Sequence, residues 1–136
     1  MYNLLVEVGV KSILIIDDDK ELSKLYAILL EEEGFVVDSA ATRSEVFQAL
    51  EKKPFPKLLL VDARLQGLDG GELIREIREK FPAASSSRFV GYSAISHTPL
   101  TKCLEQTVHS FWEKPNDVDV FISLISREWA IFTGNL

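Results

Sequence analysis

The sequence predicts a doubly wound α/β domain, with helices on both faces of a five-stranded parallel sheet. Short apolar runs of strand length occur five times, at residues 13–16, 35–37, 58–62, 89–93 and 110–113. Stretches with helical periodicity separate these runs, which is the pattern of alternating strands and helices. The chain has 136 residues, a length that suits one domain with a substantial core.

The run from Leu58 to Asp62 is the clearest strand, and it ends in a carboxylate. A fully apolar segment of this length is typical of a strand buried on both faces of a parallel sheet. The run at residues 13–16 likewise ends in three acids, Asp17 to Asp19. Right-handed crossovers bring the carboxyl ends of all the strands to one edge, where ligands bind in open α/β sheets.

Capping and stop signals delimit the helices between the strands. We expect helices from Glu21 to a stop at Gly34, from a cap at Thr42 to Pro54, after a cap at Asp69, from Pro99 to about Thr107, and after a cap at Asn116 or Asp117. Residues 81–88 are expected to form a loop, and glycines 67, 70 and 71 a flexible one. Gly91 weakens the fourth strand.

Composition excludes several functional classes. Apolar residues make up 46% and charged residues 26% of the chain, which indicates a folded protein. The 15 basic and 21 acidic side chains give a net charge of −6, and the basic ones are scattered, so we expect no direct nucleic acid binding. Cys103 is the only cysteine, which excludes an internal disulfide and fits a cytoplasmic protein. No signal peptide and no membrane span is expected.

Five polar residues fall at or just after strand ends: Asp17, Asp18, Asp62, Ser93 and Lys114. Clustered carboxylates repel one another unless a cation lies between them, and Mg²⁺ is the best candidate before Ca²⁺. A carboxylate at such a site can attack a phosphoryl group, while a lysine and a hydroxyl contact the phosphoryl oxygens. Taken singly, each residue also has an ordinary explanation, such as a helix cap or a solvated charge. Their convergence on one edge favours a site of acyl-phosphate formation.

Four segments, taken in order, resemble the signature segments of the receiver domain of two-component response regulators. They are Ile15 to Asp19, Leu60 to Gly70, Tyr92 to Ala94 and Phe111 to Pro115. The resemblance covers residues 11–130 and implies a flavodoxin-like sheet with strand order 2-1-3-4-5. It leaves residues 1–10 as an N-terminal extension and 131–136 as a C-terminal tail.

The resemblance implies a role for each matching residue. Asp62 matches the phosphoacceptor, and Asp17 and Asp18 match the acidic pair that binds Mg²⁺ together with Asp62. The backbone carbonyl of Arg64 matches a further metal ligand, and Lys114 matches the lysine that contacts the phosphoryl group.

The resemblance also implies a conformational switch. Ser93 matches the hydroxyl residue that turns toward the phosphoryl group, and Phe111 matches the aromatic switch residue. The Lys114–Pro115 bond is a candidate for the cis form. Gln66, where the family usually has proline, and Thr107-Val108, where it usually has a Gly-Ala pair, depart from the pattern. The second departure lies near the family's usual partner-binding face.

The predicted function follows from these roles. Asp62 accepts a phosphoryl group from a phosphohistidine donor, either a histidine kinase or a phosphotransfer protein, and a protein-binding surface changes for a downstream target or output domain. The chain would be a signalling domain rather than an enzyme, and it can pair through the face of its fourth helix and fifth strand. Only seven residues follow Trp129, so we expect no output domain within these 136 residues.

Three alternatives stay open on the sequence alone. A HAD-like phosphatase with an aspartate nucleophile would use Asp17, with Asp19 in its Asp-x-Asp motif, although the chain is short for that fold and Lys20 fits its motif poorly. A degenerate receiver would act only as an interaction module, and an α/β interaction domain without chemistry is the simplest case.

Overall fold

The computed structural model describes residues 9–95 and 97–135. Its main sheet has five parallel strands in the order β2-β1-β3-β6-β7, which confirms the predicted order 2-1-3-4-5. These strands are β1 (Lys11–Ile16), β2 (Phe35–Ala40), β3 (Leu58–Asp62), β6 (Arg88–Ser93) and β7 (Ser110–Glu113). Strand β3 therefore lies at the centre of the sheet, with Asp62 as its last residue.

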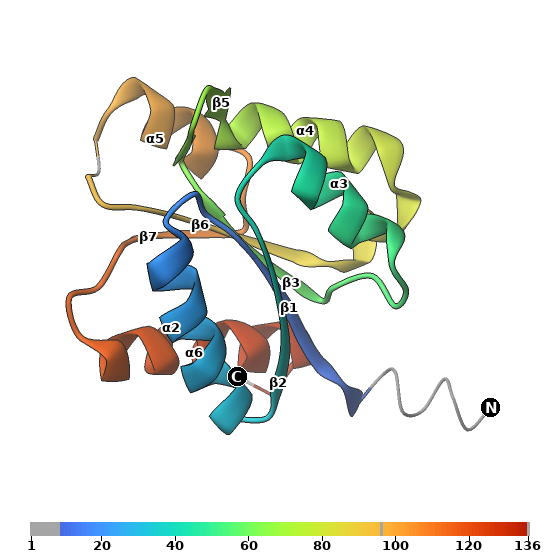
Figure 1. Cartoon of the computed structure of the whole chain (residues 1–136), viewed down its shortest axis with the longest axis vertical. Coiled ribbons are helices and arrows are strands. Elements are labelled where there is room, and N and C mark those ends of the chain that lie inside the picture. The colour runs from blue at the N-terminus through green and yellow to red at the C-terminus, as the bar shows by residue number, and fades with distance from the viewer. Residues whose placement is uncertain (1–8, 96, 136) are drawn as a thin grey trace.

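Helices cover both faces of the sheet (Figure 1). One layer contains α2 (Lys20–Glu32) and α6 (Val118–Thr133), and the other contains α3 (Arg43–Glu51), α4 (Gly70–Lys80) and α5 (Pro99–Glu105). Alternate residues of β3 enter different cores: Leu58 and Leu60 pack toward α2 and α6, whereas Leu59 and Val61 pack toward the other layer. Both faces of the strand are buried, which explains its wholly apolar sequence.

Polar side chains cap the helices where the sequence predicts them. Thr42, Asp69 and Asp117 each accept a hydrogen bond from a backbone N–H in the first turn of α3, α4 and α6. Asp19 caps α2 in the same way, by accepting a bond of 3.0 Å from the amide of Leu22. Of the three consecutive acids, Asp19 is therefore engaged as a helix cap.

The segment after Asp62 contains more regular secondary structure than expected. It forms a small antiparallel hairpin of β4 (Arg64–Leu65) and β5 (Leu68–Asp69), and Gly67 takes a positive φ of 70° in its turn. The expected loop is shorter than predicted, because Gly70 and Gly71 belong to α4. A Cβ on Gly70 would lie 2.3 Å from the backbone oxygen of Asp62, so only glycine lets the helix start this close.

Two further local expectations need correction. The segment predicted as a loop contains a short 3₁₀ helix, η1 (Pro82–Ser86). The Lys114–Pro115 bond is trans, so the cis prediction is wrong; in the described residues the cis bond lies at Lys53–Pro54. The backbone N–H of Lys114 donates to the carbonyl of Ser93 at 2.8 Å, which places the lysine at the site with an ordinary trans bond.

The ends of the predicted domain are only partly described. Residues 1–8 of the expected N-terminal extension lie outside the described residues, and α6 continues to Thr133, past the expected boundary at residue 130. The limits 11–130 stay a prediction. Within the described part of the chain, no helix combines the length and apolar character needed to cross a bilayer.

Candidate functional site at the carboxyl edge of the sheet

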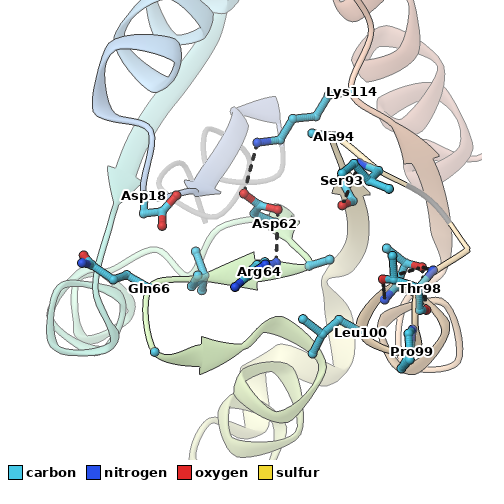
Figure 2. Close-up of a pocket in the computed structure, with 15 residues that line it drawn as sticks. Asp18, Asp62, Arg64, Gln66, Ser93, Ala94, Thr98, Pro99, Leu100 and Lys114 are labelled. Carbon is cyan, nitrogen blue, oxygen red and sulfur yellow. Dashed lines mark hydrogen bonds and ion pairs between the residues drawn. The ribbon is translucent and has the colours of Figure 1, made fainter.

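The five predicted site residues lie together at the carboxyl edge of the sheet. Asp17 and Asp18 follow β1, and Asp62 and Ser93 end β3 and β6, while Lys114 follows β7. All except Asp17 line one cavity of about 660 Å³, which continues past the β4–β5 hairpin toward the start of α5. Figure 2 shows Asp18, Ser93 and Lys114 arranged around Asp62.

The three carboxylates are close enough to share one cation. Asp17, Asp18 and Asp62 can each offer an oxygen, and these oxygens lie within 4.8 Å of one another. Asp17 and Asp62 are buried, whereas Asp18 is exposed at the mouth of the site. Hard oxygen donors with one side open to water suit Mg²⁺, which keeps several waters when bound. The residues present therefore fit the predicted metal.

Lys114 joins two of the carboxylates. Its Nζ donates to Oδ2 of Asp17 at 2.9 Å and to Oδ2 of Asp62 at 3.1 Å. Burial lowers the pKa of Lys114, but the hydrogen bond to Asp17 and the charges of both acids outweigh burial, so its pKa is raised overall. The ammonium is thus charged at neutral pH and offsets part of the negative charge at the site.

Asp62 holds its negative charge at a cost. Burial, followed by the charge of Asp17, raises the pKa of Asp62 from 3.8 to about 6, against the opposing effects of Lys114 and of the Arg64 amide. That amide donates to Oδ1 of Asp62 at 3.2 Å. Ionisation of Asp62 is therefore unfavourable in the absence of a cation. A bound positive ion would stabilise the ionised carboxylate.

The predicted switch residues flank the site. The Oγ of Ser93 is largely buried beside Asp62 and accepts a bond of 3.3 Å from the amide of Ile95 (Figure 2). Phe111 is half-buried against the core on the α5 side of the sheet. It lies over Gly91, where an added Cβ would be 3.2 Å from the Phe111 ring and 2.7 Å from Leu104. Close packing by α5 therefore accounts for the glycine inside β6.

Sequence reasoning gave no role to Tyr92, which the structure brings into contact with the site. Its hydroxyl donates to Oδ2 of Asp17 at 2.5 Å. Burial, with the nearby charge of Asp17, raises the pKa of Tyr92 well above its ordinary value, so the phenol keeps its proton. A tyrosine in a buried strand needs a hydrogen-bond partner for its hydroxyl. This requirement is the feature of the sequence that could have indicated a contact between Tyr92 and a polar group.

With this geometry established, comparison with known proteins decides the family. The family model described as "Response regulator receiver domain" matches residues 13–126. This chain belongs to the response regulator receiver domain family. The receiver is 40% identical over 121 residues to an uncharacterized 14.6 kDa protein of Leptolyngbya boryana, covering 88% of this chain and 91% of that one.

Other relatives are larger proteins or share mainly the fold. The receiver is 31% identical to the CAI-1 autoinducer sensor kinase/phosphatase CqsS of Vibrio cholerae, over 85% of this chain but 17% of that protein. It spans 24% to 51% of three further curated regulators. A CheY-like receiver domain protein from Methanospirillum hungatei has the same fold, with a TM-score of 0.77 and 23% identity over 94% of this chain and 100% of that one.

The receiver geometry does not favour the phosphatase alternative. Oδ1 of Asp17 accepts from the amide of Asp19, and Oδ2 accepts from Tyr92 and Lys114. The side chain of Asp17 is fully buried, and it does not line the cavity that Asp62 faces. Asp19, the second acid of the alternative motif, caps α2. Of Asp17 and Asp62, only Asp62 lines this cavity.

Proposed function

We propose that this receiver domain accepts a phosphoryl group on Asp62 from a phosphohistidine donor. The observation that carries the proposal is the environment of Asp62, a carboxylate that lines an open cavity and is contacted by the Lys114 ammonium at 3.1 Å. The hydroxyl of Ser93 lines the same cavity. A nucleophile, a cation and a hydrogen-bond donor thus converge on one space large enough for a phosphoryl group.

The proposed step is a transfer between a nitrogen and an oxygen. A carboxylate oxygen of Asp62 attacks phosphorus, the P–N bond of the phosphohistidine breaks, and the imidazole of the donor leaves with the electron pair and takes a proton from solvent. Lys114 neutralises charge on the transferred oxygens, and Ser93 donates a hydrogen bond to one of them. The acceptor is consumed stoichiometrically, so we class the domain as a signalling protein rather than an enzyme.

Asp17, Asp18, Asp62 and the backbone carbonyl of Arg64 would hold Mg²⁺ in this reaction. When bound, the ion supplies positive charge to the transferring oxygens. The support is the close approach of three carboxylates, together with the raised pKa of Asp62, to which burial contributes most and the charge of Asp17 next. Arg64 enters through the receiver pattern, and its amide already contacts Asp62.

The consequence of phosphorylation is a changed binding surface. Ser93 moves toward the phosphoryl group, and Phe111 turns inward into the space that Ser93 leaves. These two movements repack the face formed by α5 and β7. The donor is a histidine kinase or a phosphotransfer protein in the cytoplasm, and the reader of the altered face is a downstream protein, an output domain or a second receiver. The receiver itself, residues 11–130, contacts neither nucleic acid nor membrane.

Acetyl phosphate with Mg²⁺ tests the proposal directly. We expect intact-mass analysis to show one added phosphoryl group, labile to hydroxylamine as acyl phosphates are. Peptide mapping should place it on Asp62, and Asp62→Asn should abolish it. Asp38→Asn, which changes an exposed carboxylate on β2, is the matched control and should leave the modification unchanged.

The same reagents test the phosphatase alternative. The modification should survive Asp17→Asn, at a lower rate because a metal ligand is lost. A modification abolished by Asp17→Asn but retained by Asp62→Asn would refute the proposal. Sustained turnover of phosphate esters that depends on Asp17 alone would instead identify a phosphatase.

A further inference from the structure

Tyr92 precedes Ser93 on β6, and adjacent residues of a strand point to opposite faces of the sheet. Its exposed fraction is 0%, so the phenol is buried among the side chains that pack between the sheet and helices α2 and α6. Its hydroxyl nevertheless reaches the edge of the sheet and donates to Asp17 at 2.5 Å. A residue of the core thus contacts an acid that the proposed function assigns to Mg²⁺.

The hydrogen bonds to Asp17 nearly saturate its carboxylate. A carboxylate has roughly four lone-pair directions. Oδ1 accepts from the amide of Asp19 at 3.0 Å, and Oδ2 accepts from Tyr92 at 2.5 Å and from Lys114 at 2.9 Å. Three directions are therefore occupied, and about one is left for a cation. Asp17 cannot rotate without losing at least one of these bonds.

Tyr92 also contacts the lysine. The Nζ of Lys114 lies 4.7 Å from the centroid of the Tyr92 ring, a cation–π distance. The ring face of Tyr92 supports the ammonium that bridges Asp17 and Asp62, while its hydroxyl fixes the Asp17 end of that bridge. One side chain therefore restrains both the acid and its counter-ion.

Neighbouring rings hold Tyr92 in place. Its ring meets Trp112 edge to face at 5.6 Å between centroids, and Trp112 meets Phe121 at 6.1 Å. Phe121 in turn stacks on Tyr26 with centroids 3.6 Å apart. This aromatic column, Tyr92-Trp112-Phe121-Tyr26, anchors the phenol to α6 and α2, so its hydroxyl is presented to Asp17 in a fixed direction.

We propose that Tyr92 is a positioning residue that orients Asp17, and through it the bridging Lys114, for binding a divalent cation. The proposal rests on the assignment of Asp17 as a Mg²⁺ ligand. Groups that hydrogen-bond to a metal ligand fix its orientation, and their loss costs roughly 10- to 100-fold in metal affinity. We therefore expect Tyr92→Phe, which keeps the ring and removes the hydroxyl, to weaken Mg²⁺ binding at least about tenfold.

Mg²⁺ titration followed by tryptophan fluorescence measures this effect. The chain has two tryptophans, so Trp129→Phe is placed in every variant to leave Trp112, the ring against Tyr92, as the reporter. Isothermal titration calorimetry gives the same dissociation constant independently of the fluorophore. Urea unfolding without Mg²⁺ separates a change in affinity from a change in stability.

Tyr26→Phe is the matched control. It removes a phenol hydroxyl from the same aromatic column that also lies within range of the charges of Asp17 and Lys114, whereas the described hydrogen bonds to Asp17 come from other residues. The comparison therefore isolates the hydrogen bond from Tyr92. We expect its Mg²⁺ affinity to stay within about twofold of the parent. If Tyr92 acts through Asp17, then Tyr92→Phe should have little further effect on the residual affinity of Asp17→Asn.

The outcomes are distinguishable. A parent that binds no Mg²⁺ would overturn the proposed metal site and this inference together. A parent that binds Mg²⁺ and a Tyr92→Phe variant within twofold of it would overturn the inference alone.

If Tyr92→Phe does not fold, the proposal can be tested by NMR on the protein without this substitution, labelled with ¹³Cζ-tyrosine. The Tyr92 signal should then shift with Mg²⁺ saturation, and a signal that stays fixed would overturn the proposal.

Discussion

Replacing Asp62 by asparagine should stabilise the metal-free receiver, although it removes the proposed phosphoacceptor. The folded protein raises the pKa of Asp62 from 3.8 to about 6, a difference of about 2.2 pH units. At about 1.4 kcal/mol per pH unit, ionised Asp62 costs the folded state up to about 3 kcal/mol. Asparagine is neutral and avoids this cost. It also loses one acceptor, so we expect a gain of about 1 to 3 kcal/mol at pH 8.

The pH dependence has a definite sign. Because the folded state binds the Asp62 proton more tightly than the unfolded state, stability falls as the pH rises from 3.8 through 6. Below 3.8 the group is protonated in both states and costs nothing, and well above 6 the full cost is present. For a pKa of about 6, the advantage of Asp62→Asn should be about 1.4 kcal/mol larger at pH 8 than at pH 5.

Urea denaturation in EDTA at the two pH values measures this difference. Asp38→Asn is the control, because this exposed acid makes a long ion pair of 3.6 Å with exposed Lys52 and accepts a hydrogen bond of 2.9 Å from the Ser39 amide, which an asparagine oxygen can also accept. The effect of this substitution should stay within about 0.5 kcal/mol. Saturating Mg²⁺ should reduce the difference in unfolding free energy between Asp62→Asn and the parent, because the ion stabilises the parent more than the variant. The reasoning would be refuted by an Asp62→Asn variant less stable than the parent at pH 8, or by an advantage that does not change with pH.

Two further predictions concern the scaffold that holds the site. Gly70→Ala places a Cβ 2.3 Å from the backbone oxygen of Asp62 and should lower the free energy of unfolding, measured by heat or urea, by about 1 to 3 kcal/mol. Gly71→Ala, whose added Cβ would have the Cys103 side chain as its nearest neighbour at 3.1 Å, should lower it clearly less. Equal effects of the two substitutions would contradict the close approach at Gly70. Glu128→Ala leaves Arg88 without its buried carboxylate partner at 2.7 Å and should cost about 3 kcal/mol of unfolding free energy. Glu76→Ala, which breaks two more exposed ion pairs, with Arg43 and Lys80, should cost less than about 1 kcal/mol. A larger cost for Glu76→Ala than for Glu128→Ala would contradict this reasoning.

The sequence predicted the framework of the site because that framework depends on patterns along the chain. An apolar run followed by a polar residue is visible without a structure, and parallel topology alone brings Asp62, Ser93 and Lys114 to one edge. The helix cap at Asp69 was equally visible, since capping is a local interaction.

The missed features depend on distances between elements. In a buried strand, Tyr92 satisfies the apolar pattern as phenylalanine would, and only its position across the sheet from Asp17 gives the hydroxyl a partner. Gly91 and Gly70 looked like weak or flexible points. Each is instead set by a close approach, of Leu104 in α5 and of the Asp62 backbone, that a side chain would block.

The two faces of the sheet beside the site differ in how freely they can rearrange. Strand β7 pairs with β6 so that Phe111 lies beside Gly91 and Trp112 beside Tyr92. Trp112 belongs to the aromatic column, where every ring has an aromatic neighbour, and dense packing of this kind resists small displacements. Phe111 is half-buried next to a strand position that carries no side chain.

Lys114 contacts Asp62 and follows three residues after Phe111, so one segment connects Asp62 to residues on both faces of the sheet. We infer that the side facing α2 and α6 serves as the fixed support that holds Asp17, and that the α5 side provides the movement.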